Sequence, residues 1–142
     1  MIRKTSWAIW TGGIKDGGGT ISTETGVLRD APYGFKSRFE GGKGTNPEEL
    51  IGAAHAGCFS MALALMLGEA GLTVDRIETH AAVSLDKVGD AFAITASHLT
   101  VKAIIPGATA DQFARIAEQA KLGCPVSKLL NARITMEATL GA

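Results

Sequence analysis

The feature that most constrains this chain is a long stretch near its middle without charged side chains. Between Leu50 and Gly68 no Asp, Glu, Lys or Arg occurs, and alanine, leucine and glycine dominate. Asn46 suits the N-cap of a helix, Pro47 its first position and Gly71 its C-terminal stop. A helix that is apolar almost all round is usually covered on most sides. We therefore expect one long, buried helix.

Charge and polarity exclude several classes of protein. Lysine plus arginine equals aspartate plus glutamate at 14 each, so nothing indicates binding to nucleic acid or to an anionic membrane. The apolar stretch contains His55, and a membrane-spanning helix is not expected. Residues 1–7 lack the apolar segment of a secretory signal. We expect a single cytoplasmic domain, 1–142, in which cysteines are more often catalytic, redox-active or merely buried than disulfide-bonded.

The first third alternates short strand-like segments with turns. The segments are Ser6–Trp10, Thr20–Glu24 and Phe35–Phe39, and the turns are Thr11–Gly13, Lys15–Gly19 and Ala31–Gly34. The run Gly17–Gly19 completes neither nucleotide-binding fingerprint, so we interpret it as a hairpin turn. A small antiparallel sheet is the expected result.

The second half predicts a long hairpin, a helix and a closing strand. Alternating apolar residues mark strands over Arg76–Val88 and Ala91–Ile105, and a third over Arg133–Leu140. Thr109 and Gln112 match a capping box at the start of the helix. Its inward side chains are expected to be Phe113, Ile116, Ala117 and Ala120. Helices and sheets together predict an α+β fold.

Two cysteines are the candidate reactive groups. Cys58 lies within the apolar helix, where a cysteine ordinarily behaves as a small hydrophobic side chain. Cys124 directly precedes Pro125 at a helix start, a position that lowers the pKa of a thiol, although a cysteine can also serve there as an indifferent cap. No C-x-x-C motif joins them, so only the fold can bring the pair together.

A reactive thiol also needs a cation beside it. Arg38 lies between Phe35 and Phe39, which can form an apolar wall for its guanidinium, although a surface arginine fits the same pattern. Glu49 follows Asn46 by three residues and can close a capping box, which leaves Glu48 the freer partner for an arginine.

Metal and hydrolase chemistry find little support. His55 and Cys58 are three residues apart on one helix, but no second pair of ligands completes a metal site. His80 and His98 lie on separate strands, and no G-x-S-x-G motif is present. We expect no metal and no cofactor.

Four segments together resemble one family. They are Tyr33–Phe35, Ser37–Leu63, Val83–Val88 and Gly123–Ser127, in an order that spans nearly the whole chain. The chain is identified as a member of the OsmC/Ohr family, in its OsmC (osmotically inducible protein C) branch. The sister branch, of organic hydroperoxide resistance proteins, usually carries its arginine in an early glycine-rich turn, where this chain has Gly12–Ile14.

The resemblance implies a fold, an assembly and a reaction. It implies antiparallel sheets packed around a long buried central helix, in an intertwined homodimer with its active sites at the subunit interface. It also implies a cytoplasmic, cofactor-free peroxidase that reduces organic hydroperoxides, is restored by a dithiol such as a lipoyl group, and acts in oxidative and osmotic stress. The family's peroxidatic cysteine corresponds to Cys58, its resolving cysteine to Cys124, its arginine to Arg38 and its glutamate to Glu48.

Substrate preference and two other functions remain to be decided. The apolar residues Phe39, Phe59 and Met61 favour organic hydroperoxides over hydrogen peroxide. A thiol redox sensor would use the same cysteines but signal through a partner. An interaction protein with inert, buried cysteines is the other alternative.

Overall fold

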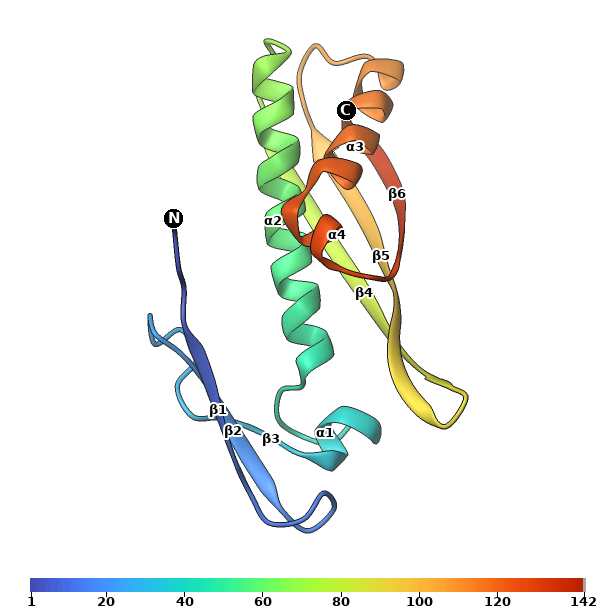
Figure 1. Cartoon of the computed structure of the whole chain (residues 1–142). Coiled ribbons are helices and arrows are strands. Elements are labelled where there is room, and N and C mark those ends of the chain that lie inside the picture. The colour runs from blue at the N-terminus through green and yellow to red at the C-terminus, as the bar shows by residue number, and fades with distance from the viewer. Residues whose placement is uncertain (142) are drawn as a thin grey trace. The chain divides into compact units, whose positions relative to one another are not determined.

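The computed structural model describes residues 1–141 and has an α+β architecture with two three-stranded sheets (Figure 1). Residue contacts group into two compact units, the first ending at Leu50 and the second beginning at Ile51. The α+β class predicted from the sequence is confirmed.

The first unit contains an antiparallel sheet. Strands β1 (Ser6–Thr11), β2 (Gly18–Thr23) and β3 (Ala31–Tyr33) pair in the order β1-β2-β3. The predicted glycine hairpin joins β1 to β2, where the Gly17 N–H donates to the carbonyl of Gly13 at 2.8 Å. A Cβ on Gly17 would lie 2.4 Å from that carbonyl oxygen, so this tight turn requires a glycine.

The predicted strand over Phe35–Phe39 is wrong, because these residues form the short helix α1. Gly34 is extended and caps the helix, and the Ser37 side chain bonds locally to it. The Gly34 N–H donates to the Ser37 hydroxyl at 2.9 Å, and that hydroxyl donates to the Gly34 carbonyl at 3.0 Å. Such local hydrogen bonds compete with a sheet ladder. The third strand of the sheet comes from Ala31–Tyr33, which the sequence predicted as a turn.

The long helix α2 (Pro47–Glu69) begins and ends close to the predicted residues. The Glu49 N–H donates to Asn46 Oδ1 at 2.8 Å, which confirms the N-cap. Glu49 does not reach back as a capping box requires, because its carboxylate accepts instead from the Thr45 hydroxyl at 2.7 Å. Gly71 follows the helix with a φ of +78°, as a C-terminal stop requires.

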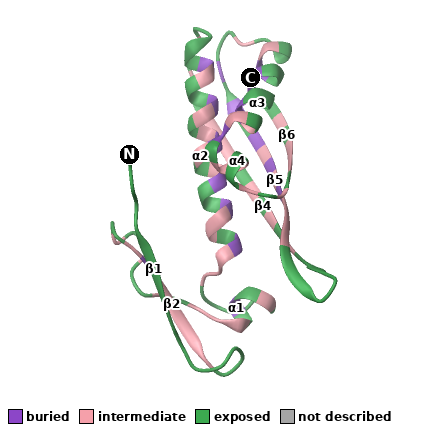
Figure 2. Ribbon diagram, viewed as in Figure 1, coloured by how far each residue is buried: buried purple, intermediate pink, exposed green. Residues whose placement is uncertain are grey.

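The expectation that α2 is buried on most sides is wrong for the single chain. One stripe is fully buried: His55, Phe59, Leu63 and Leu67. On the other side Met61 and Leu65 are 77% and 63% exposed, and Figure 2 shows exposed and buried positions alternating along the helix. By length and mean hydropathy α2 is able to cross a membrane, a property that it shares with core helices of soluble proteins.

The second sheet has the strand order β4-β5-β6. Strands β4 (Arg76–Val88) and β5 (Ala91–Ile104) form the predicted hairpin, with Gly89 in the turn at a φ of +64°. Strand β6 (Arg133–Gly141) confirms the predicted closing strand. It pairs parallel to β5, so the expectation of purely antiparallel sheets is wrong. The helices between β5 and β6 supply the crossover that a parallel pair needs.

Two helices lie in that crossover, α3 (Ala110–Gly123) and α4 (Pro125–Leu129). The Gln112 N–H donates to the Thr109 hydroxyl at 3.1 Å, as predicted for the start of α3. The four side chains predicted to point inward are buried. They share one core with Phe59, Leu63 and Leu67 of α2 and with Leu99, Val101 and Ala103 of β5. This core fixes the surroundings of both cysteines.

Candidate active site

The fold brings the two predicted cysteines together within the second unit. Cys58 lies on α2 and is half-buried, and Cys124 lies between α3 and α4 and is fully buried. Both are free thiols that pack in the same core, and Gly123 and Pro125, on either side of Cys124, line one groove with Cys58. The fold therefore brings the two cysteines into one region without a C-x-x-C motif, as a disulfide between them would require.

Cys124 is held by its backbone on both sides. Its N–H donates to the carbonyl of Ala120 at 2.9 Å, and its own carbonyl accepts from the Lys128 N–H at 3.0 Å. Cys124 thus ends α3 and caps α4, with Pro125 as the first residue of the second helix. The predicted helix start is confirmed, and it explains why this cysteine has a fixed place beside α2.

The surroundings of Cys58 in the second unit disfavour its thiolate. Burial raises the pKa of the Cys58 thiol, and the neighbouring Cys124 raises it further. The backbone N–H of Val126 hydrogen-bonds to the Cys58 sulfur and acts in the opposite direction. Because the net shift is upward, Cys58 needs a positive charge nearby to ionise readily near neutral pH.

Cys58 opens into an apolar groove of about 560 Å³. Six other residues line it: Met61, Ala62, Leu65, Met66, Gly123 and Pro125. None carries a charge, so the groove suits an organic molecule better than a small polar one. Of the apolar residues expected near the thiol, Met61 lines the groove, whereas Phe59 is fully buried in the core and does not.

Arg38 and Glu48 form an ion pair in the first unit. Arg38 Nη2 and Nε both donate to Glu48 Oε1, at 2.8 and 3.1 Å. Glu48 is 8% exposed, and the side chain of Arg38 is 37% exposed. The choice of Glu48 over Glu49 as the partner of the arginine is confirmed. The buried carboxylate fixes one edge of the guanidinium and leaves part of it accessible.

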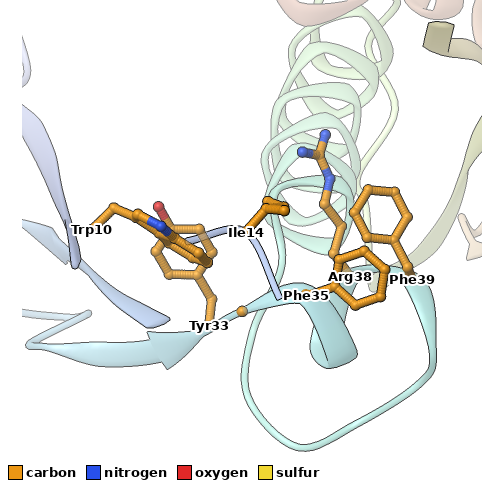
Figure 3. Close-up of a pocket in the computed structure, with 7 residues that line it drawn as sticks. Trp10, Ile14, Tyr33, Phe35, Arg38 and Phe39 are labelled. Atoms are coloured by element: carbon orange, nitrogen blue, oxygen red, sulfur yellow. The ribbon is translucent and has the colours of Figure 1, made fainter. Parts of the chain in front are cut away.

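Arg38 is one of the residues that line an aromatic pocket (Figure 3). It has a volume of about 180 Å³ and is lined mainly by Trp10, Tyr33, Phe35 and Phe39. Arg38 lies over the ring of Phe39 at 5.4 Å, so the apolar wall expected beside this arginine is present. Ile14 lines the same pocket, from the turn where the sister branch was expected to carry its arginine.

The residues that the sequence did not single out are the partners of His55. Its Nδ1 lies 2.7 Å from the Ser97 hydroxyl and its Nε2 lies 2.8 Å from the Ser127 hydroxyl. Burial lowers the pKa of His55, which favours the neutral ring. Ser97 and Ser127 stand far from His55 in sequence, so no spacing pattern pointed to them. Among residues 1–141 no cluster of three His, Cys, Asp or Glu side chains is able to hold a metal ion.

Comparisons with known proteins identify the family of the chain. Residues 40–139 match the family model described as OsmC-like protein. The chain is 60% identical over 139 residues to Peroxiredoxin OsmC of Escherichia coli (strain K12), covering 98% of this chain and 97% of the relative. It is 28% identical over 105 residues to organic hydroperoxide resistance protein-like 2 of Staphylococcus epidermidis, covering 72% of each chain.

Solved structures show the same fold. The organic hydroperoxide resistance protein OhrB of Bacillus subtilis aligns with a TM-score of 0.72 and 28% identity, over 96% of this chain and 98% of that one. An OsmC-like protein of Vibrio cholerae aligns with a TM-score of 0.77 and 15% identity, over 97% of this chain and 99% of that one. The second likeness, at so low an identity, concerns the fold alone.

Proposed function

The chain belongs to the family of OsmC-like proteins and is a thiol-dependent peroxidase of organic hydroperoxides, and we propose that Cys58 is its peroxidatic and Cys124 its resolving cysteine. The observation that carries the assignment is the pair of adjacent free thiols, of which only Cys58 opens into the apolar groove. The more exposed thiol, Cys58, reacts with the substrate, and the buried thiol, Cys124, reacts afterwards with the oxidised Cys58.

The proposed reaction has two steps in the protein. The Cys58 thiolate attacks the terminal oxygen of the hydroperoxide, an S–O bond forms, and the O–O bond breaks. The leaving alkoxide takes a proton and departs as an alcohol, which leaves Cys58 as a sulfenic acid. Cys124 then attacks that sulfur, its proton and the hydroxide leave as water, and a Cys58–Cys124 disulfide remains. An external dithiol, such as a reduced lipoyl group, then reduces the protein disulfide to two thiols and is itself oxidised to a disulfide.

In this proposal Arg38 supplies the positive charge, and Glu48 orients it. The raised pKa of Cys58 means that its own groove does not stabilise the thiolate. Arg38, oriented by the buried carboxylate of Glu48, stabilises the thiolate and the negative charge that develops on the peroxide. The steps proposed here require no metal or cofactor.

The proposed assembly is an intertwined homodimer with its active sites at the subunit interface. The proposed location of the protein is the cytoplasm. The apolar face of α2 supports the homodimer, because Met61 and Leu65 are large, exposed and adjacent to Cys58 in the groove. Covering such side chains with a second copy removes apolar area from water. In the dimer α2 becomes the buried central helix that the sequence predicts.

Counting thiols tests the assignment. One equivalent of cumene hydroperoxide per chain is expected to consume two free thiols, with continued turnover when excess dithiol is present. Cys58→Ser is expected to abolish turnover. Cys124→Ser is expected to allow one oxidation and then to stall. Two thiols that stay unreactive would refute the proposal, and two-thiol loss without turnover would favour a redox sensor.

Substrate preference has its own test. Because the groove beside Cys58 is apolar, cumene hydroperoxide is expected to turn over faster than hydrogen peroxide at equal concentration. Equal rates for the two peroxides would show that the groove does not select the substrate.

A further inference from the structure

The hydrogen bonds of His55 connect three elements of the second unit. His55 lies on α2, one helical turn before Cys58, and is fully buried. Its Nδ1 bonds to Ser97 on β5, which is also fully buried, and its Nε2 bonds to Ser127 on α4. Buried polar groups at these distances restrict the elements that carry them, because breaking a bond leaves an unsatisfied group behind.

Besides the bond from His55 and the buried Cys124 that caps it, the helix α4 is held to the core by one side chain, Val126. The helix is five residues long, and none of its residues is fully buried. Yet this region adjoins Cys58, because Gly123 and Pro125 line its groove, and both Cys124, which caps α4, and the Val126 N–H influence the pKa of the Cys58 thiol. Ser127 is the next residue in the chain. The bond from His55 to Ser127 therefore restrains the segment of α4 that lies beside Cys58.

His55 is not placed to act as a base. A neutral imidazole has one donor and one acceptor nitrogen, and both nitrogens are occupied by serine hydroxyls. Each hydroxyl can donate or accept, so the neutral ring satisfies both bonds in either tautomer. This arrangement fixes position without supplying charge to the thiol.

We propose that His55 is a positioning residue, which through Ser127 holds α4 against α2 and so keeps the Cys124 sulfur and the Val126 N–H beside Cys58. The inference deepens the proposed function and rests on it for the roles of the two cysteines. It assigns a purpose to the buried Ser97–His55–Ser127 chain, in which Ser97 anchors the ring to the sheet and Ser127 carries the restraint to α4.

The first test measures how well Cys58 and Cys124 are held together, with no peroxide present. In purified full-length protein, the Cys58–Cys124 disulfide is equilibrated against reduced and oxidised glutathione. Ser127→Ala removes the bond to His55 and is expected to lower the equilibrium constant for the disulfide about tenfold, the effect of one buried hydrogen bond.

Ser60→Ala is the matched control. Ser60 lies on α2, the helix of His55 and Cys58, and its hydroxyl bonds to the Thr79 hydroxyl of β4 at 2.7 Å and to the Ala56 carbonyl of α2 at 2.8 Å. Ser60→Ala therefore removes a comparable hydroxyl whose two bonds do not involve α4. Its disulfide equilibrium is expected to match the wild type. Equal equilibrium constants for Ser127→Ala, Ser60→Ala and the wild type would overturn the inference.

A second readout follows the thiol itself. The pH dependence of Cys58 alkylation by iodoacetamide, measured in a Cys124→Ser background, reports its pKa. Ser127→Ala is expected to shift this profile to higher pH, because a loosened α4 withdraws the Val126 N–H from the sulfur. A change in overall stability alone would leave the profile in place, and an unshifted profile would count against positioning.

Substitution of His55 separates its two bonds. A glutamine amide reaches about as far as Nε2 and an asparagine amide about as far as Nδ1, so His55→Gln is expected to keep the disulfide equilibrium and His55→Asn to lose it as Ser127→Ala does. The opposite order would refute the role of Ser127. If the wild type turns over no hydroperoxide while Ser127→Ala still weakens the disulfide, the proposed function fails and the positioning role stands.

Discussion

Replacing Glu48 by glutamine removes one charge and retains the oxygen that Arg38 contacts. Both guanidinium bonds, at 2.8 and 3.1 Å, end on Oε1. The guanidinium keeps its charge and can still donate to the amide oxygen, so what is lost is the attraction between two opposite charges, about 4 kcal/mol at about 4 Å and an effective dielectric constant of about 20. The side chain of Arg38 is 37% exposed, and solvent screening reduces the total loss to about 1 kcal/mol.

The expected result is a fall of about fivefold in kcat/KM for cumene hydroperoxide, because a less firmly oriented Arg38 stabilises the transition state less well. Glu49→Gln is the control. It removes a charge from the same helical turn, and its carboxylate bonds only to Thr45 in the first unit. Both variants lose a similar favourable interaction with the helix dipole, about 0.3–1 kcal/mol of stability.

Steady-state kinetics with excess dithiol, together with urea unfolding of each variant, make the comparison. Glu48→Gln is expected to lose about fivefold in activity and Glu49→Gln to keep it, with free energies of unfolding that differ by no more than about 1 kcal/mol. Equal activity of the two variants, whether both are impaired or neither, would refute the argument that Glu48 orients Arg38 for catalysis.

Three further predictions concern the core, the pH dependence and the assembly. Leu63 is fully buried, so Leu63→Ala should lower the free energy of unfolding by about 2–5 kcal/mol, measured as a shift of the urea midpoint. Burial lowers the pKa of His55 below 6.5, so the unfolded chain binds a proton more readily than the folded one. The free energy of unfolding should therefore fall as the pH drops below about 6.5, and His55→Gln should flatten this dependence; an unchanged curve would show that another group titrates. Leu65→Arg should shift sedimentation of the proposed dimer to that of a monomer, because it places a charge on the exposed apolar face of α2; a wild type and variant that sediment alike would place the interface elsewhere.

Local signals predicted most of the elements and several of their ends. Asn46 and Thr109 cap their helices as expected, because a cap is a contact between residues close in sequence. The same rule explains the main error in secondary structure. The spacing of Phe35 and Phe39 fits a strand or a helix, and the bond between Ser37 and Gly34 decides for the helix.

Pairing and burial were less accessible to sequence reasoning. The alternation of β6 indicates a strand but not its neighbour or direction, which depend on where α3 and α4 deliver the chain. The apolar composition of α2 predicts that its side chains are covered, but it does not say whether the same chain or a second copy covers them. Hence Leu63 is buried within the chain while Leu65, equally apolar, is exposed.

By itself the sequence determined the identity of the chemical groups: two thiols, one arginine between two phenylalanines and the acid that pairs with it. Only the tertiary structure decided which groups meet. Cys58 and Cys124 become neighbours because α3 and α4 share a core with α2, and His55 meets Ser97 and Ser127 for the same reason. Contacts between residues far apart in sequence follow from packing of the whole core, which no spacing pattern records.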